Sequence, residues 1–172
     1  TWTIRREDLD ADTLLIGVYE RFEPLARERN IRLCLELPEE PLPHITGDGQ
    51  RLEQVLSILL DNALKYSDGP GQICLSLKPR GRSGCTLTVT NTVQGLEPGD
   101  LNCLFERFYR TDSDRARSQG GYGLGLSIAK SIVDGHRGRI SVSSSAISGT
   151  LFTVRLPLPG RGLGHLRPRS LG

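Results

Sequence analysis

One stretch of the sequence places polar side chains at helical spacing. Asn62, Lys65 and Tyr66 follow Ile58 at steps of three or four residues, so in a helix they form one stripe. An amide oxygen is a hard ligand suited to Mg²⁺, a lysine supplies a positive charge for a phosphate group, and an aromatic ring can cover a flat base. The stripe is therefore typical of a nucleotide site, although a solvated helix face has a similar composition.

A second stretch, GGYGLGLSIAK, joins glycines to the start of an amphipathic helix. Gly121, Gly123 and Gly125 carry no Cβ, so the backbone there can approach an anion closely. The helix directly behind them offers unpaired backbone N–H groups to phosphate oxygens. A packing or hinge role explains the same glycines. A dinucleotide-binding fingerprint is disfavoured, because its glycines would follow a strand near the start of a parallel unit.

Two further segments carry side chains that can line such a site. The sequence LFERFYR gathers Phe105, Phe108 and Tyr109 shortly before the glycines. These aromatic residues fit either a small satellite core or a lid that docks and undocks. Thr150 follows Gly149 at the start of a late strand, where its hydroxyl can reach a ligand or cap a turn. The residues alone leave both alternatives open for each segment.

Three helices are expected to position these residues. The first has Asp8 and Asp10 as capping candidates, ends near Asn30, and carries apolar residues at helical spacing, namely Leu14, Leu15, Val18, Phe22 and Leu25. The second begins after Asp48, and a stripe of apolar residues turns one of its faces toward the core: Leu52, Val55, Leu56, Leu59 and Ala63. The third covers about residues 125–134.

Strands are predicted where apolar and polar residues alternate between turn signals. The expected ranges are 1–4, 31–37, 72–77, 85–91, 139–144 and 150–156. Helices and strands do not alternate strictly as in parallel units. We therefore expect an α/β (α+β) two-layer sandwich, with one mixed, mostly antiparallel sheet covered on one face by about three helices. The stretch 92–121 is irregular and too long for a simple connection.

Composition indicates one globular domain. The chain has 172 residues, of which 37% are hydrophobic and 24% charged, as in folded domains. Its apolar runs are shorter than the roughly 20 residues of a transmembrane helix, so we expect a soluble chain. A net charge of +2 gives no overall attraction to nucleic acid, and no nucleic-acid partner is expected. The domain is predicted over residues 1–159, followed by a flexible basic tail over residues 160–172.

The cysteines and histidines show no spacing that indicates a metal site or a disulfide. Three of the four cysteines lie among apolar neighbours in strand-like runs, and none forms a CxxC pair: Cys34, Cys74, Cys85 and Cys103. We interpret them as buried free thiols of a reducing cytoplasm. The histidines are interpreted as surface or turn residues: His44, His136 and His165.

The motifs DNALKYS, NTVQGL, LFERFYR, GGYGLGLSIAK and GT, in this order, resemble the successive boxes of the histidine-kinase branch of the Bergerat-fold (GHKL) ATPases. The resemblance covers about residues 3–158. It implies a catalytic HATPase_c domain of a two-component sensor histidine kinase, with the Bergerat fold and a flexible ATP lid. ATP and Mg²⁺ are the cofactors that it implies.

The resemblance assigns roles to individual residues. It places around ATP the residues Asn62, Lys65, Tyr66, Asn91, Gly95, Leu96, Gly121, Tyr122, Gly123, Leu124, Gly125, Leu126 and Thr150. Asn62 would hold Mg²⁺, Lys65 would contact phosphate, and Tyr66 would flank the adenine. The three glycines Gly121, Gly123 and Gly125 would cradle the phosphates. As catalytic residues it implies Asp61, Asn62 and Arg110, where Arg110 would reach the γ-phosphate and Asp61 occupies the position at which ATP-hydrolysing relatives carry a general base.

Two departures from the family pattern bear on this site. In NTVQGL, Asn91 replaces the usual aspartate and Val93 replaces a glycine. The aspartate accepts a hydrogen bond from the adenine amino group; an asparagine carbonyl can also accept it, but with roughly half the strength of a charge-assisted bond. Ile58 stands where many relatives carry a polar residue, so one helper for metal or phosphate is missing.

The resemblance also implies partners that lie outside this chain. The γ-phosphoryl group would pass to a histidine on a helical dimerisation hairpin and then to an aspartate of a response regulator receiver domain. We expect a monomeric fragment, cytoplasmic, from a parent anchored in the bacterial inner membrane. Two alternatives are a degenerate nucleotide-binding domain that acts as a scaffold or regulator, and a related GHKL protein serine kinase.

Overall fold

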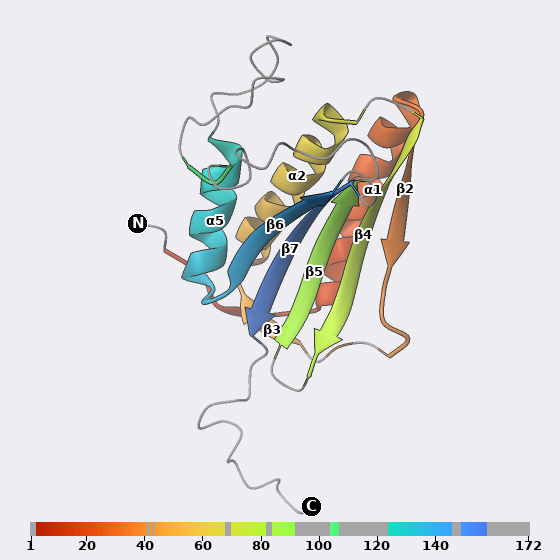
Figure 1. The fold of residues 1–172 in the computed structure, drawn as a ribbon. Coiled ribbons are helices and arrows are strands. Elements are labelled where there is room, and N and C mark those ends of the chain that lie inside the picture. The colour runs from red at the N-terminus through yellow and green to blue at the C-terminus, as the bar shows by residue number, and fades with distance from the viewer. Residues whose placement is uncertain are drawn as a thin grey trace, which may run out of the picture.

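The computed structural model of the chain describes residues 3–40, 42, 44–67, 70–81, 84–91, 104–106, 124–145 and 149–157. Over these ranges a layer of helices packs on a layer of strands (Figure 1). The helices are α1 (Ala11–Glu28), α2 (Gly49–Lys65) and α5 (Gly125–Gly135). The strands are β1 (Glu7–Leu9), β2 (Ile31–Glu36), β3 (Ile45–Gly47), β4 (Gly71–Arg80), β5 (Gly84–Asn91), β6 (Arg139–Ser145) and β7 (Gly149–Pro157).

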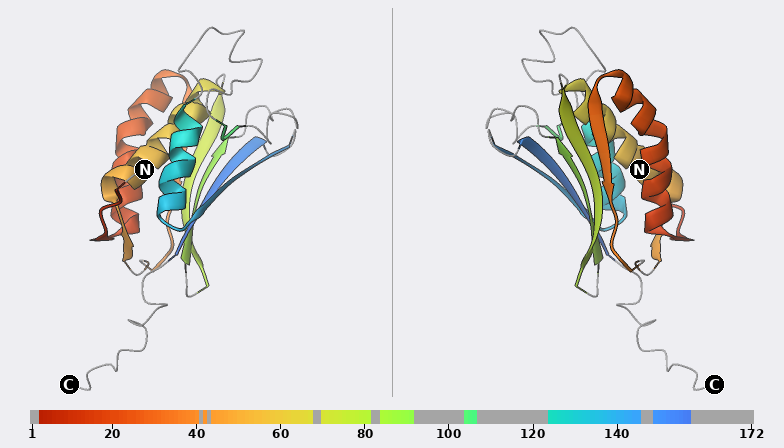
Figure 2. Two further views of the ribbon diagram at one scale, coloured as in Figure 1. Left: turned by 90° about the vertical axis from the view of Figure 1, so that its left-hand side faces the viewer. Right: turned by 90° about the vertical axis from the view of Figure 1, so that its right-hand side faces the viewer.

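The main sheet has five strands in the order β2-β4-β5-β7-β6. Strand β2 runs parallel to β4, whereas the other neighbouring pairs are antiparallel. Strands β1 and β3 form a separate antiparallel ribbon. Figure 2 shows α1, α2 and α5 together on one face of the main sheet. This arrangement confirms the predicted two-layer sandwich with a mixed, mostly antiparallel sheet.

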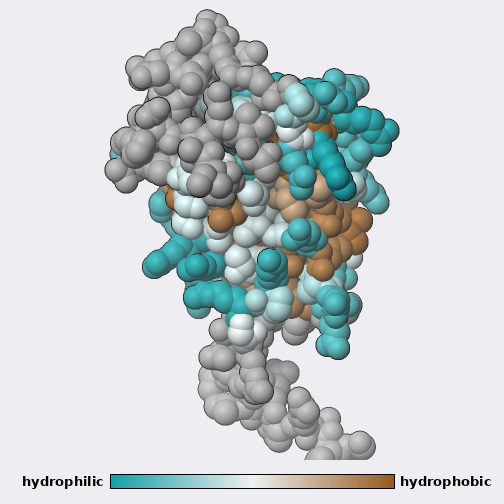
Figure 3. Space-filling model, turned by 45° about the vertical axis from the view of Figure 1, so that its right-hand side comes forward, coloured by the Kyte–Doolittle hydropathy of each residue, from teal (hydrophilic) through white to brown (hydrophobic). Residues whose placement is uncertain are grey.

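Alternation along the strands turns one face of the sheet toward the core. In β5 the side chains of Cys85, Leu87, Val89 and Asn91 are buried, while the threonines between them are half-buried. The opposite face carries hydroxyl and charged side chains of β4, β5 and β6. Figure 3 shows mostly pale and hydrophilic colours, with hydrophobic side chains gathered on the side of β2 and α1. The core therefore lies between the sheet and the helices.

The first two helices begin at the caps that the sequence indicates. The Asp10 side chain accepts hydrogen bonds from the backbone N–H groups of Asp12 and Thr13, and Asp48 accepts one from the backbone of Arg51. The predicted apolar stripe of α2 is buried throughout. In α1 the apolar residues keep the predicted helical spacing, but Leu25 is 47% exposed and does not face the core.

The amino-terminal strand differs from the prediction. The first described strand is β1, Glu7–Leu9, whereas Thr3 and Ile4 of the predicted range lie outside any strand. The first two residues of that range lie outside the described residues. Its partner β3, Ile45–Gly47, was not predicted. Each strand has three residues, which is too short for an alternating pattern to emerge.

A buried histidine joins α5 to α2. His136, at the C-cap of α5, lies in a turn, which is one of the two predicted alternatives, but it is 4% exposed and therefore not a surface residue. Its Nε2 accepts a hydrogen bond of 2.9 Å from the backbone N–H of Asp48, and its Nδ1 lies 2.8 Å from the carbonyl oxygen of Ile132. Both bonds form when Nδ1 carries the proton. The Asp48 carboxylate also accepts a bond from the backbone N–H of Arg5, so these hydrogen bonds link His136 and Asp48 to the segment before β1.

The described cysteines lie in strands, as predicted, but only Cys85 is buried. Cys34 of β2 and Cys74 of β4 are half-buried, because they lie on the sheet face that the helices leave open. Cys103 and the predicted tail lie outside the described residues. Within the described ranges, no helix is both long enough and apolar enough to cross a bilayer.

Candidate functional site

A cavity lies between the C-terminal end of α2 and the neighbouring strands. It encloses about 380 Å³ of space, part of which is open to solvent. Its lining consists of Asn62, Ala63 and Tyr66 from α2, Val89 and Asn91 from β5, Leu104, and Thr150 and Phe152 from β7. Apolar walls with a few polar groups are typical of a site for a flat, partly polar ligand.

Helix α2 brings two of its predicted site residues to the cavity. Leu59 and Ala63 are buried against the core, and this fixes the rotation of the helix so that Asn62 and Tyr66 line the cavity. The Lys65 Nζ lies 5.5 Å from the centre of the Tyr66 ring, close enough for a cation–π contact.

Asp61 has a different position from its neighbour on α2. Its side chain is exposed, and it does not belong to the cavity lining given by the described residues. Nearby groups still desolvate its carboxyl group enough to raise its pKa. Asp61 therefore precedes a lining residue, Asn62, but does not itself line the cavity.

Asn91, at the end of β5, is tied to the last turn of α2. It is 5% exposed, and its Nδ2 donates a hydrogen bond of 3.2 Å to the carbonyl oxygen of Ala63. The same carbonyl accepts a bond of 2.6 Å from the Ser67 hydroxyl. Carbonyl groups in the last turn of a helix lack partners within the helix, so both side chains satisfy this one. The contact orients the Asn91 amide with its NH₂ toward α2.

The opposite wall of the cavity comes from β7 and the segment 104–106. Thr150 is the Cα partner of Asn91 in the β5–β7 register, and its hydroxyl lies 3.2 Å from that of Ser144. Phe105 packs edge-to-face on Phe152, with ring centres 6.3 Å apart, and Leu104 is buried. The described part of LFERFYR therefore packs on the main core and not in a separate satellite core. The lid alternative concerns Phe108 and Tyr109, which lie outside the described residues.

The glycine-rich motif is described only from Leu124 onward. Gly125 begins α5, and a Cβ there would lie 3.3 Å from Cγ2 of Ile58. This close approach supports the packing role for Gly125 and explains Ile58, whose side chain packs against the first turn of α5. Leu126 is half-buried against the core. The start of α5 has no side-chain cap, so its first N–H groups are not satisfied in that way.

The remaining predicted site residues lie outside the described residues: Gly95, Leu96, Arg110, Gly121, Tyr122 and Gly123. Conversely, four lining residues were not predicted as site residues: Ala63, Val89, Leu104 and Phe152. Ala63 belongs to the stripe that was expected to face the core, and Val89 and Phe152 lie within predicted strands. Val89 and Phe152 meet as register partners of β5 and β7, and that long-range pairing has no local sequence signal.

The fold and this cavity together define an ATP-binding catalytic domain of the histidine-kinase type. The chain belongs to the histidine kinase-, DNA gyrase B-, and HSP90-like ATPase family, whose model matches residues 47–160. Among curated relatives, the signal transduction histidine-protein kinase BaeS of Escherichia coli (strain K12) is 40% identical over 130 residues, which are 76% of this chain and 27% of BaeS. The chain spans about a third or less of the curated relatives it matches.

Solved structures extend the likeness to nearly the whole chain. Full-length ShkA in complex with AMPPNP matches with a TM-score of 0.80 and 27% identity, over 91% of this chain and 32% of ShkA. Histidine kinase ThkA in complex with the response regulator protein TrrA matches with a TM-score of 0.74 and 26% identity, over 89% of this chain and 42% of that one. These likenesses confirm the predicted fold and the predicted family.

Proposed function

We propose that this chain binds Mg·ATP in the α2 cavity and presents the γ-phosphoryl group to a histidine on a helical hairpin of its parent protein. From there the phosphoryl group would pass to an aspartate of a response regulator. The observation that carries the proposal is the cavity itself: apolar walls from β5 and β7 meet the polar groups of Asn62, Asn91 and Thr150 at the end of α2.

The residues present fit the substrate and the metal. The apolar wall of Val89, Leu104 and Phe152 suits a flat base. The Asn91 amide, held with its NH₂ on the Ala63 carbonyl, has its oxygen to accept a bond from an adenine amino group.

The polar end of the cavity suits phosphate and metal. Asn62 offers an amide oxygen, which is a suitable ligand for Mg²⁺ alongside waters and phosphate oxygens. Lys65 and Arg110 would contact phosphate, and Gly121 and Gly123 would let the backbone approach it. When bound, Mg²⁺ would neutralise charge on the phosphates, so the protein's part is positioning and electrostatic stabilisation.

The described histidines support an acceptor from outside this chain. Asn62 lies in the last turns of α2, whereas both histidines belong to the other end of this helix. His44 precedes β3, which leads into α2, and His136 bonds to Asp48, the N-cap of α2. A 17-residue helix is roughly 25 Å long at ~1.5 Å per residue, so neither imidazole is near the cavity. His136 also has both ring nitrogens in hydrogen bonds.

The wider setting follows from the same proposal. The parent would be a sensor kinase with this domain on the cytoplasmic face of the bacterial inner membrane, and the isolated domain would be a monomer. The TrrA complex of ThkA supports a response regulator as the downstream partner. Asn91 and Val93 favour one competing function, a degenerate domain that regulates a partner kinase without using ATP productively.

Calorimetric titration with a non-hydrolysable ATP analogue tests the proposal. We expect micromolar to submillimolar binding that strengthens with Mg²⁺. Asn62→Ala should weaken binding in Mg²⁺ by at least about tenfold, or ~1.4 kcal/mol, and should remove most of the metal dependence. Gln50→Ala, exposed at the opposite end of α2, is the matched control. A folded sample that does not bind at millimolar nucleotide would favour the regulatory scaffold.

A further inference from the structure

Two thiols lie side by side on the sheet face that carries no helix. Cys34 of β2 and Cys74 of β4 are direct Cα partners in the parallel register of these strands. Both are half-buried, so solvent reaches them. Neither lines the α2 cavity, and the nucleotide site makes no use of them.

The strand pattern explains why both thiols point the same way. Leu33 and Ile73, one residue before each cysteine, are buried on the helix side. Because side chains alternate along a strand, Cys34 and Cys74 project to the open face. Neighbouring strands lie about 4.8 Å apart, so the Cβ atoms of an in-register pair are separated by a similar distance.

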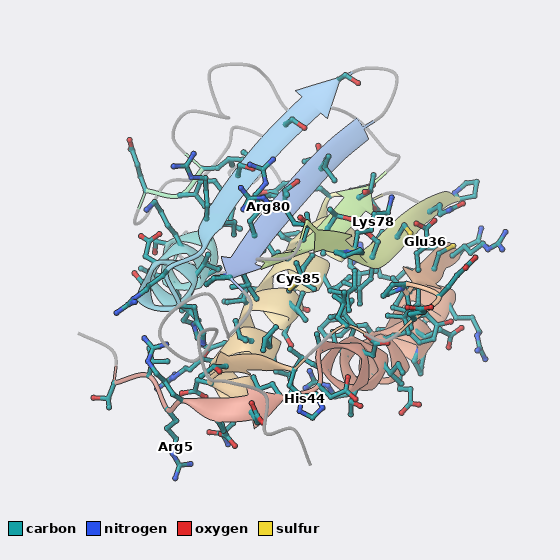
Figure 4. All side chains as sticks on the ribbon, turned by 90° about the horizontal axis from the view of Figure 1, so that it is seen from below. Arg5, Glu36, His44, Lys78, Arg80 and Cys85 are labelled. Atoms are coloured by element: carbon teal, nitrogen blue, oxygen red, sulfur yellow. The ribbon has the colours of Figure 1, made fainter. Side chains whose placement is uncertain are left out.

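Charged side chains flank the pair on the same two strands. The Cys74 thiol is hydrogen-bonded to Glu36, and burial, the Glu36 charge and Cys34 raise the pKa of Cys74 to about 11, while Lys78 acts in the opposite direction. Figure 4 labels Glu36 of β2 and Lys78 of β4, which both act on the Cys74 thiol. At neutral pH Cys74 is therefore a thiol, which disfavours spontaneous nucleophilic chemistry.

The register allows two uses of paired thiols. Neighbouring strands lie about 4.8 Å apart, and this falls within the Cα separation of disulfides, roughly 4.4–6.8 Å. A soft ion between two sulfur atoms needs metal–sulfur bonds of about 2.3 Å each, so thiols on two neighbouring strands can also hold one such ion. No group of three His, Cys, Asp or Glu side chains that could hold a metal ion exists among the described residues, so a tetrahedral zinc site is disfavoured there.

We propose that Cys34 and Cys74 form a two-coordinate site for a soft monovalent cation of the Cu(I) and Ag(I) class. Thiolate ligands favour such ions over hard cations. Binding replaces two S–H bonds by two metal–sulfur bonds and releases two protons to the solvent, with no change of oxidation state. The site gains one negative charge overall, which the Lys78 ammonium favours and the Glu36 carboxylate opposes. The bound ion would join edge strand β2 to β4.

Silver(I) is the probe, because it does not oxidise thiols to a disulfide under anaerobic conditions. The reduced protein is titrated without chloride or added thiol, and stoichiometry, proton release and thermal stability are measured. We expect one tight equivalent of Ag(I), two protons released, a higher Tm, and protection of Cys34 and Cys74 from maleimide by peptide mass spectrometry.

Serine variants identify the ligands. Cys34→Ser and Cys74→Ser should each lower the Ag(I) affinity by about 100-fold or more, because the second thiolate acts at high effective concentration, and each should abolish the Tm increase. Cys103→Ser, which alters the one cysteine outside the described residues, is the control and should bind like the wild type. Circular dichroism checks that each variant folds.

Three results would overturn the proposal. The first is tight binding that survives both single serine variants. The second is loss of binding in Cys103→Ser alone. The third is a Cys34–Cys74 disulfide that forms readily in air while Ag(I) does not protect the reduced pair, since it would show that the pair serves as a disulfide and not as an ion site.

Discussion

Replacing Asn91 by aspartate tests how this chain accommodates its departure from the family motif. The Asn91 Nδ2 donates to the Ala63 carbonyl at 3.2 Å in a buried position. A carboxylate has no hydrogen to donate, so Asn91→Asp would set a charged oxygen against a carbonyl oxygen. The same substitution would give the proposed adenine contact a charged acceptor. Stability and nucleotide affinity are therefore expected to move in opposite directions.

The two magnitudes follow from the same contact. Losing a buried hydrogen bond and leaving its partner facing a charge costs roughly 1–3 kcal/mol of unfolding free energy. A charge-assisted bond is about twice as strong as a neutral one, a difference of about 1 kcal/mol, or roughly fivefold in Kd. We expect Asn91→Asp to unfold more easily and to bind the ATP analogue several-fold more tightly.

The pH dependence supplies an independent check. Protonated, the new side chain can donate to the Ala63 carbonyl, so folding should raise its pKa above the unfolded value of about 3.9. With the folded pKa raised, the deficit relative to wild type is absent below the unfolded pKa and develops as pH rises through the folded pKa. Urea denaturation from pH 3 to 8 measures this, with Asn91→Ala as the uncharged control. A variant as stable as the wild type at pH 7, or one with unchanged affinity, refutes the reasoning.

Two more predictions concern the other end of α2. A Cβ at Gly47 would lie 2.8 Å from Cδ2 of His136, whose ring is held by hydrogen bonds at both nitrogens, so Gly47→Ala should destabilise the domain by about 1–3 kcal/mol. Thermal melts of both variants measure this. The control is Gly17→Ala, which has no atom near the added Cβ and should leave stability unchanged or raise it. Burial alone would raise the pKa of Asp48, but two backbone N–H bonds and nearby positive charge hold it below its usual value. The Asp48 carboxylate therefore stabilises the fold at pH values above its unfolded pKa, and this stability is lost as pH falls through the folded pKa. Asp48→Asn should lose less stability than the wild type below about pH 4. Urea denaturation at several acidic pH values measures this, and an equal loss in both proteins would contradict it.

Local signals made the helices and most strands predictable. Asp10 and Asp48 are caps that precede apolar stripes, and cap and stripe lie within a few residues of one another. Strands β4, β5, β6 and β7 alternate between turn signals in the same way. Strands β1 and β3 were not predicted, because three residues are too few to show an alternation of apolar and polar side chains.

The missed features depend on contacts between distant parts of the chain. His136 is buried where it bonds to Asp48, which lies 88 residues earlier in the sequence. The residues next to His136 in the sequence therefore do not indicate its burial. Val89 and Phe152 line the cavity only through the β5–β7 register. The resemblance to a family indicated Asn62, Tyr66, Asn91 and Thr150, whereas the walls that enclose them required the fold.

The β5–β7 register also has a consequence for the order of folding. Strands β4 and β5 form one hairpin and β6 and β7 another, and such local pairs form early because little chain entropy is lost. The cavity exists only once Asn91 meets Thr150 and the two hairpins dock. A nucleotide therefore has no complete site on partly folded chains. It should slow unfolding of the native domain while leaving the refolding rate nearly unchanged.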